Sequence, residues 1–212
     1  AYDVPRRPDL ASALHIVMLP GSRRSEIRHI LPPMLAGFEM LRDSFPEITA
    51  TIPTLPRIAD SIEASCAATA SAEAISIDQD EGALFRALGS GHAVLAASGT
   101  VTLQTALYGA PGVACYIAPA LSAAIGRRLV SMDRVILPNA LLGREVYPFL
   151  FQERASAPAL AGAMRQVLSD AEAGRRAAND AEDLRKMLRG GAGSFEAGVV
   201  EAMADWLGTP SL

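Results

Sequence analysis

Two apolar runs, each ending in a short glycine-containing turn, constrain the fold of this chain more than any other feature. The run Ile16–Leu19 passes into Pro20-Gly21-Ser22-Arg23-Arg24-Ser25-Glu26, and the run Ala93–Ala96 passes into Ala97-Ser98-Gly99-Thr100. A buried strand that ends in such a turn and is followed by a helix presents unpaired backbone N–H groups, which attract anions. Arg23 adds a fixed positive charge to the first turn, so the pattern favours a diphosphate ligand.

Segments typical of buried strands alternate with Ala- and Leu-rich segments typical of helices. This alternation predicts a parallel sheet covered on both faces, because each crossover between parallel strands carries a helix. The expected strands are Leu14–Leu19, Ile48–Ile52, Ala74–Ile77, His92–Ala97, Gly112–Ile117 and Val135–Leu137. The expected helices between them are Pro33–Ser44, Arg57–Ala70, Gly82–Leu88, Val101–Tyr108 and Ala120–Val130. The fold class that follows is α/β, with a Rossmann-like parallel sheet flanked by helices.

Pro32 and Pro33 interrupt what would otherwise be one long helix from Ser25 to Ser44. Proline lacks the N–H group and clashes with the preceding turn. We therefore expect one short turn after Ser25 and a new helix that begins near Pro33.

The character of the chain changes near Ala157, from which point strand-like runs are absent. Three helices are expected there, over Ala159–Ser169, Glu172–Leu188 and Phe195–Leu207, with a flexible glycine segment at Gly190–Gly193. The predicted organisation is a linker over residues 1–12, a Rossmann-like nucleotide-sugar-binding domain over 13–156, and C-terminal helices over 157–212. Those helices pack on the sheet domain or are exchanged with a partner.

Composition excludes several classes of function. The net charge is −4 and the pI is about 5.4, which argues against nucleic acid as a partner. Cys66 and Cys115 have no zinc-like spacing and are expected to be free thiols in a reducing compartment. No apolar stretch approaches the roughly 20 residues that cross a bilayer, so we expect a cytoplasmic or peripheral protein. His15 and His92 are expected to be structural residues, as lone strand histidines usually are.

The two glycine-containing turns are expected to face one cleft. Ligands of an open α/β sheet bind outside the carboxyl ends of the strands, where the strand order reverses. Taken alone, Ser98 or Thr100 is better explained as the cap of a helix, and Asn139 as the cap of a short helix after Pro138.

Three motifs in order carry a resemblance to a known family. They are Leu19–Ile27, Ala97–Thr100 and Leu137-Pro138-Asn139. With these motifs the chain resembles the C-terminal half of the lipid-A-disaccharide synthase family, inverting glycosyltransferases of the GT-B type, over about Ala13 to Leu207. The resemblance implies transfer of diacylglucosamine from UDP-2,3-diacylglucosamine to 2,3-diacylglucosamine 1-phosphate (lipid X), which releases UDP. It implies no metal and no cofactor, and it places the general base in an N-terminal domain outside this chain, so the chain alone is expected to be inactive.

The resemblance also implies roles for particular residues. Arg23 and Asn139 would be catalytic, by neutralising and orienting the diphosphate that leaves. The substrate-binding residues would be Gly21, Ser22, Arg24, Glu26, Ser98, Gly99, Thr100, Gln104 and Tyr116. Glu26 would brace Arg23. Gln104 stands where the family typically has a glutamate, and its neutral amide is a weaker acceptor for ribose hydroxyls.

Further partners are expected from the same reasoning. The segment Ala118–Met132 combines apolar residues with Arg127 and Arg128, and either lies on an anionic membrane surface or covers the sheet as an ordinary helix. The apolar residues Pro148–Gln152 could pack against a partner, and a homodimer is possible through the terminal helices. Two other functions are open: another UDP-sugar epimerase or transferase of GT-B-like fold, and a non-catalytic nucleotide-binding module.

Overall fold

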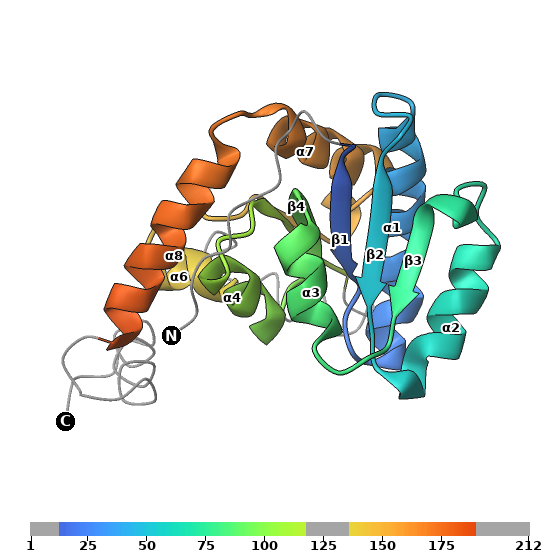
Figure 1. The fold of residues 1–212 in the computed structure, drawn as a ribbon, viewed down its shortest axis with the longest axis horizontal. Coiled ribbons are helices and arrows are strands. Elements are labelled where there is room, and N and C mark those ends of the chain that lie inside the picture. Colours follow the sequence, from blue (N-terminus) through green and yellow to red (C-terminus); the bar gives the residue numbers. More distant parts are fainter. Residues whose placement is uncertain (1–12, 118–135, 190–212) are drawn as a thin grey trace.

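The chain folds around a six-stranded parallel sheet in a computed structural model that describes residues 13–117 and 136–189 (Figure 1). The strand order is β3-β2-β1-β4-β5-β6, and every neighbouring pair is parallel. The strands are β1 (His15–Leu19), β2 (Thr49–Pro53), β3 (Ile75–Asp78), β4 (Ala93–Ala97), β5 (Gly112–Tyr116) and β6 (Phe149–Phe151). The order reverses between β1 and β4, as in a doubly wound sheet. The predicted fold class is therefore confirmed.

Alternate residues of the central strands enter two separate hydrophobic cores. In β1, Ile16 and Met18 belong to one core, while Val17 and Leu19 belong to the other. Successive side chains of a strand point to opposite faces, so a strand buried on both faces reads as a continuous apolar run. This is why the apolar runs in the sequence located the central strands.

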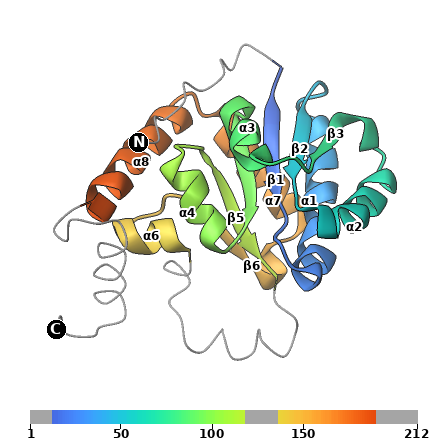
Figure 2. The same cartoon turned by 60° about the horizontal axis from the view of Figure 1, so that its bottom comes forward.

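Helices cover both faces of the sheet (Figure 2). Core residues on one face come from α1 (Arg24–Arg42), α2 (Pro56–Ala67) and α7 (Ala157–Ser169). Core or packed residues on the other face come from α3 (Ala83–Ser90), α4 (Thr100–Leu107), α6 (Leu137–Leu142) and α8 (Ala173–Arg189). Two short 3-10 turns lie at Ala72–Ala74 and Gln152–Arg154.

The predicted break at Pro32 and Pro33 is wrong, because α1 runs unbroken through both prolines. Each proline removes one N–H, which leaves a backbone carbonyl four residues earlier without its helical partner. Those carbonyls belong to the exposed residues Arg28 and His29, where solvent can hydrogen bond to them. The opposite face of α1 is anchored in the core by residues that are at most 4% exposed: Ile27, Ile30, Leu31, Met34, Leu35, Phe38 and Leu41. Burial of this face outweighs the two lost hydrogen bonds.

The predicted sixth strand at Val135–Leu137 is also wrong. Ile136 is the N-cap of α6, and Pro138 lies in the first turn of that helix, where its missing N–H carries no penalty. The sixth strand is instead β6, which pairs with β5 through Ala114–Phe149 and its neighbours. The segment expected to meet a partner thus completes the sheet, with Phe149 and Leu150 packed against opposite cores.

The lone histidines are structural, as expected. The backbone N–H of His15 donates to Nδ1 of His92 at 3.0 Å, and the N–H of His92 donates to the His15 carbonyl at 2.7 Å. Burial and the neighbouring His92 lower the pKa of His15. Cys66 and Cys115 are both buried and free, which also agrees with the prediction.

Several predictions lie outside the described residues. These are the linker over residues 1–12, the helix Ala120–Val130 within Ala118–Met132, the glycines Gly190–Gly193 and the helix Phe195–Leu207. Among the helices of residues 13–117 and 136–189, none combines the length and the apolar character that a membrane span requires.

Candidate functional site

A cleft of about 1030 Å³ lies at the carboxyl ends of the strands and joins the two glycine-containing turns. The predicted residues that line it are Gly21, Ser22, Arg23, Glu26, Ser98, Gly99, Thr100, Gln104 and Tyr116. They follow β1 and β4 or, for Tyr116, end β5, and these three strands are adjacent in the sheet. Arg24 and Asn139 are not among the lining residues. The predicted convergence of the two turns is therefore present, without these two residues.

Glu26 determines the shape of the first turn. Its Oε2 accepts the backbone N–H groups of Ser22 at 3.1 Å and Arg23 at 3.2 Å, and its Oε1 accepts from Nη1 of Arg23 at 3.1 Å. The carboxylate therefore lies at the N-terminus of α1, where the helix dipole favours negative charge. Glu26 braces Arg23 as expected, but it also uses two of the N–H groups that the sequence suggested for an anion.

Arg23 carries a charge that can be redirected into the cleft. Its side chain is 77% exposed, while that of Glu26 is 14% exposed. An exposed ion pair of this kind contributes only about 0–1 kcal/mol, so the guanidinium is free to exchange partners at little cost. A diphosphate carries more negative charge than the Glu26 carboxylate, which favours exchange of the guanidinium to such a ligand.

The second turn leaves its backbone N–H groups open. The N-cap of α4 is Gly99, with no side-chain cap, so neither Ser98 nor Thr100 serves as the cap that the sequence allowed. The Gly99 carbonyl accepts from N and Oγ1 of Thr102, at 3.1 and 2.7 Å. Among the described residues, no hydrogen bond uses the N–H groups of Gly99, Thr100 or Val101. These three groups lie at the positive end of the α4 dipole and can bind an anion.

The loops after β2 and β3 form a wall of the cleft that sequence reasoning missed. They contribute Pro53–Pro56 and Gln79–Phe85. The signal for the second loop was the run Asp78-Gln79-Asp80-Glu81-Gly82, which is typical of a tight turn directly after a strand.

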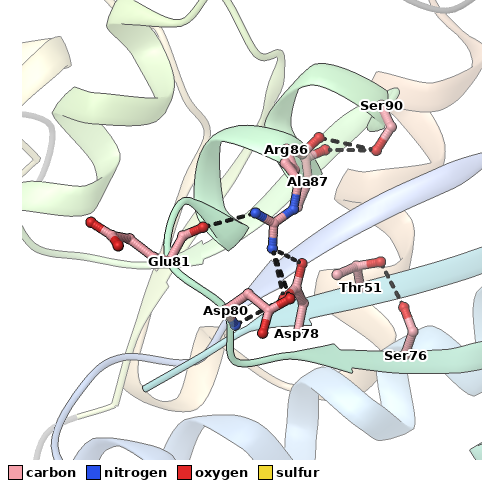
Figure 3. A network of polar contacts seen from close by, with 8 residues as sticks. All are labelled: Thr51, Ser76, Asp78, Asp80, Glu81, Arg86, Ala87 and Ser90. Atoms are coloured by element: carbon pink, nitrogen blue, oxygen red, sulfur yellow. Dashed lines mark hydrogen bonds and ion pairs between the residues drawn. The ribbon is translucent and has the colours of Figure 1, made fainter. Parts of the chain in front are cut away.

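Arg86 holds the loop after β3 in place (Figure 3). Its Nη2 donates to both carboxylate oxygens of Asp78 at 2.9 and 3.0 Å, and its Nη1 donates to the Glu81 carbonyl at 2.8 Å. The Asp80 N–H and the Arg86 guanidinium together lower the pKa of Asp78. This wall is thus fixed by one side chain of α3, that of Arg86, which does not line the cleft.

The loop after β2 adds a polar atom to the cleft, and Arg57 at the start of α2 contacts the first turn from outside the lining. Oγ1 of Thr54 is buried and has no hydrogen-bond partner among the described residues, although Thr54 itself lines the cleft. Nη2 of Arg57 donates to the Ser22 carbonyl at 3.3 Å and thereby ties α2 to the first turn.

Asn139 lies away from the cleft, inside α6, and is 4% exposed. Its Oδ1 accepts the N–H groups of Val146 and Tyr147 at 2.9 and 3.0 Å, and its Nδ2 donates to the Tyr147 carbonyl at 2.9 Å. The amide therefore has internal partners on both of its polar atoms. In this structure it holds the segment that leads into β6, and it neither caps α6 nor reaches the cleft.

Comparison with known proteins gives a consistent family. The family model described as lipid-A-disaccharide synthetase matches residues 9–200. Among curated relatives, the lipid-A-disaccharide synthase of Nitrobacter winogradskyi is 40% identical over 162 residues, which cover 76% of this chain and 40% of that protein. The synthase of Geobacter sulfurreducens is 33% identical over 187 residues, 88% of this chain and 48% of that protein. The chain thus spans less than half the length of these relatives.

Two solved structures illustrate the similarity of the fold. A spinosyn rhamnosyltransferase complexed with thymidine diphosphate gives a TM-score of 0.58 at 16% identity, covering 91% of this chain and 45% of that chain. A UDP-N-acetylglucosamine 2-epimerase from Listeria monocytogenes gives 0.55 at 14% identity, covering 95% and 47%. At these identities the likeness establishes the fold alone.

Proposed function

Because the chain belongs to the lipid-A-disaccharide synthetase family, we propose that it is the part of a glycosyltransferase that binds the nucleotide-sugar donor. In this proposal the complete enzyme transfers 2,3-diacylglucosamine from its UDP carrier to 2,3-diacylglucosamine 1-phosphate. The cleft between the first and second turns holds the UDP portion. One observation carries the proposal: two turns far apart in the sequence, each at a helix N-terminus, line the same cleft.

The diphosphate is assigned to the space between Arg23 and the first turn of α4. The open N–H groups of Gly99, Thr100 and Val101 supply fixed donors, and Arg23 supplies mobile positive charge. Since Glu26 already uses the N–H groups of Ser22 and Arg23, the second turn provides more of the backbone donors than the first. Ser98 and Gln104 line the same cleft and are proposed to contact phosphate or ribose.

The same groups explain how the chain could accelerate transfer. As the bond between the sugar C1 and the diphosphate oxygen breaks, negative charge grows on the leaving UDP. Donors that are already oriented toward that position stabilise the growing charge without further reorganisation. We place the group that deprotonates the acceptor hydroxyl in the part of the enzyme outside this chain, because the relatives are more than twice as long as the matched region.

Lipid substrates would bring the enzyme to a membrane surface, and a peripheral location is part of this proposal. Lipid X and a further N-terminal portion are the proposed partners. No step of the proposal requires a metal ion, because Arg23 and the α4 N–H groups neutralise the leaving group.

Calorimetric titration of the chain with UDP, UDP-N-acetylglucosamine and UDP-2,3-diacylglucosamine tests the proposal. Binding that is tightest for the acylated donor supports it. Equal binding of the two sugar nucleotides favours a soluble-sugar epimerase or transferase. Failure to bind any of the three favours a module without nucleotide-sugar function and contradicts the proposal.

The same titration with Arg23→Ala tests the assignment of the charge. We expect UDP affinity to fall by about 10- to 100-fold, the equivalent of one hydrogen bond between charged groups. Arg28→Ala is the matched control, since Arg28 is an exposed arginine one turn further along α1 and does not line the cleft. An equal loss in both variants would indicate a general charge effect and would remove the assignment of Arg23.

A further inference from the structure

A continuous line of buried polar contacts connects Asn139 with the N-terminal turn of α4. Asn139 hydrogen bonds to the backbone of Tyr147, and the Tyr147 hydroxyl hydrogen bonds to Thr105 of α4. Tyr147 is the largest fully buried side chain, at 1% exposed, and Asn139 is 4% exposed. A polar network at this depth must be satisfied internally, so its geometry is narrowly defined.

The hydroxyl of Tyr147 meets two groups. Its one proton has two acceptors within reach, the Ala110 carbonyl at 2.7 Å and Oγ1 of Thr105 at 3.1 Å, and it serves one of them at a time. Oγ1 of Thr105 donates in turn to the Thr102 carbonyl at 2.9 Å. When Tyr147 donates to Oγ1 of Thr105, that oxygen accepts one hydrogen bond and donates another, so loss of either hydroxyl breaks the line at α4.

The line ends at the turn that lines the cleft. Oγ1 of Thr102 donates to the Gly99 carbonyl at 2.7 Å, and the Thr102 N–H donates to the same oxygen at 3.1 Å. Thr102 and Thr105 are both 0% exposed. The Thr100 N–H belongs to the same planar peptide as the Gly99 carbonyl and points the opposite way, so holding this carbonyl toward the helix keeps the N–H directed out of the N-terminus of α4, which lines the cleft.

We propose that Tyr147, Thr105 and Thr102 are positioning residues that hold the first turn of α4 in its anion-binding conformation, and that Asn139 acts on donor binding through them. The inference rests on the proposed function, because it gives the α4 turn the diphosphate as its ligand. It also assigns Asn139 a role without contact: its amide sets the position of Tyr147, and Tyr147 sets α4.

Tyr147→Phe and Thr105→Val test this role, since each removes a hydroxyl and keeps most of the side-chain shape. We expect UDP affinity to fall by about three- to tenfold, the equivalent of one hydrogen bond. In a ¹⁵N–¹H correlation spectrum without ligand, the amide signals of Gly99, Thr100 and Val101 should shift. Thr105→Ser keeps the hydroxyl and should restore both the affinity and the signals.

Thr69→Val is the matched control. Oγ1 of Thr69 donates to the Cys66 carbonyl at 2.8 Å, the same kind of bond three residues back, but it lies past the end of α2. Removal of this hydroxyl should change neither the UDP affinity nor the amide signals of Gly99, Thr100 and Val101. If Tyr147→Phe does not fold, Thr102→Val tests the other end of the line by the same two measurements.

The outcomes separate the two proposals. Folded Tyr147→Phe and Thr105→Val proteins with unchanged UDP affinity and unchanged Gly99–Val101 signals would overturn the positioning role. A wild-type protein that binds no UDP would overturn the proposed function instead. In that case the amide signals alone test whether the buried contacts from Asn139 to Thr102 hold the α4 turn. A shift of the signals supports this role, and unchanged signals refute it.

Discussion

Gly21 has a backbone conformation that only glycine adopts readily. Its φ angle is 106°, and a Cβ built on it would lie 2.5 Å from Oε2 of Glu26. Two requirements therefore coincide at one residue, a left-handed backbone and close approach to the carboxylate that shapes the turn. The glycine in the first turn serves the turn's own geometry at least as much as access by a ligand.

Gly21→Ala is expected to lower the free energy of unfolding by about 1–3 kcal/mol, through backbone strain and contact with Glu26. Urea denaturation measures the loss. The same change made in a Glu26→Ala background should cost less, because the contact with the carboxylate is removed while the backbone strain and the 2.9 Å contact with the Cβ of residue 26 remain. Equal losses in the two backgrounds would show that the contact with the Glu26 carboxylate contributes nothing.

Burial raises the pKa of the Cys115 thiol to about 12, from a model-compound value of 9.0. Between these two pH values the folded protein keeps a proton that the unfolded chain releases. The contribution of this thiol to the free energy of unfolding is therefore complete below pH 9 and is lost as the pH rises toward 12. Between pH 8 and pH 10 the free energy of unfolding should fall by about 1.4 kcal/mol, which corresponds to one pKa unit.

Urea denaturation of wild type and Cys115→Ala at both pH values checks this expectation. The wild type should lose more stability on going from pH 8 to pH 10 than the variant does. Parallel loss in the two proteins would mean that other groups account for the whole effect.

At the scale of single elements, β5 begins where two backbones come very close. A Cβ on Gly112 would lie 2.1 Å from the Val94 carbonyl oxygen of β4, an atom of the sheet backbone that cannot move aside. Gly162, inside α7, has no atom within 4 Å of the same position. The two glycines thus differ in what surrounds them.

We expect Gly112→Ala to destabilise the protein by about 2 kcal/mol or more, since adjacent strands would have to separate. Gly162→Ala should stabilise it by about 1 kcal/mol, because alanine favours the helix and the space is open. Thermal unfolding monitored by circular dichroism measures both. A stable Gly112→Ala protein would contradict the spacing of β4 and β5.

On the scale of the whole molecule, the described elements form one sheet with two cores, and the cleft lies at one end of it. The chain covers less than half of the length of its curated relatives. A glycosyl transfer needs an acceptor site as well as a donor site, and we propose only the donor site for the cleft described here.

The chain alone should bind UDP and form no disaccharide, whereas the same chain supplied with the remaining portion of the protein should form it. Incubation with UDP-2,3-diacylglucosamine and lipid X, followed by chromatography of the products, measures this. Product formed by the chain alone would contradict the assignment of the acceptor site and the general base to the missing portion.

The sequence by itself determined the parallel α/β fold, five strands of the sheet and the two turns at its carboxyl edge. These features depend on local patterns, namely apolar runs buried on both faces and glycines at strand ends. It also predicted Glu26 as the partner of Arg23, because three residues in a helix bring two side chains to the same face.

Only the tertiary structure decided the features that depend on contacts between distant residues. The continuity of α1 through Pro32 and Pro33 depends on the core beneath it, and β6 forms because β5 offers an unpaired edge. Asn139 lies away from the cleft because its amide is hydrogen bonded to the backbone of Val146 and Tyr147, which are distant in sequence from both turns. Burial energy and long-range hydrogen bonds outweigh local propensity at these places, and neither can be read from neighbouring residues in the sequence.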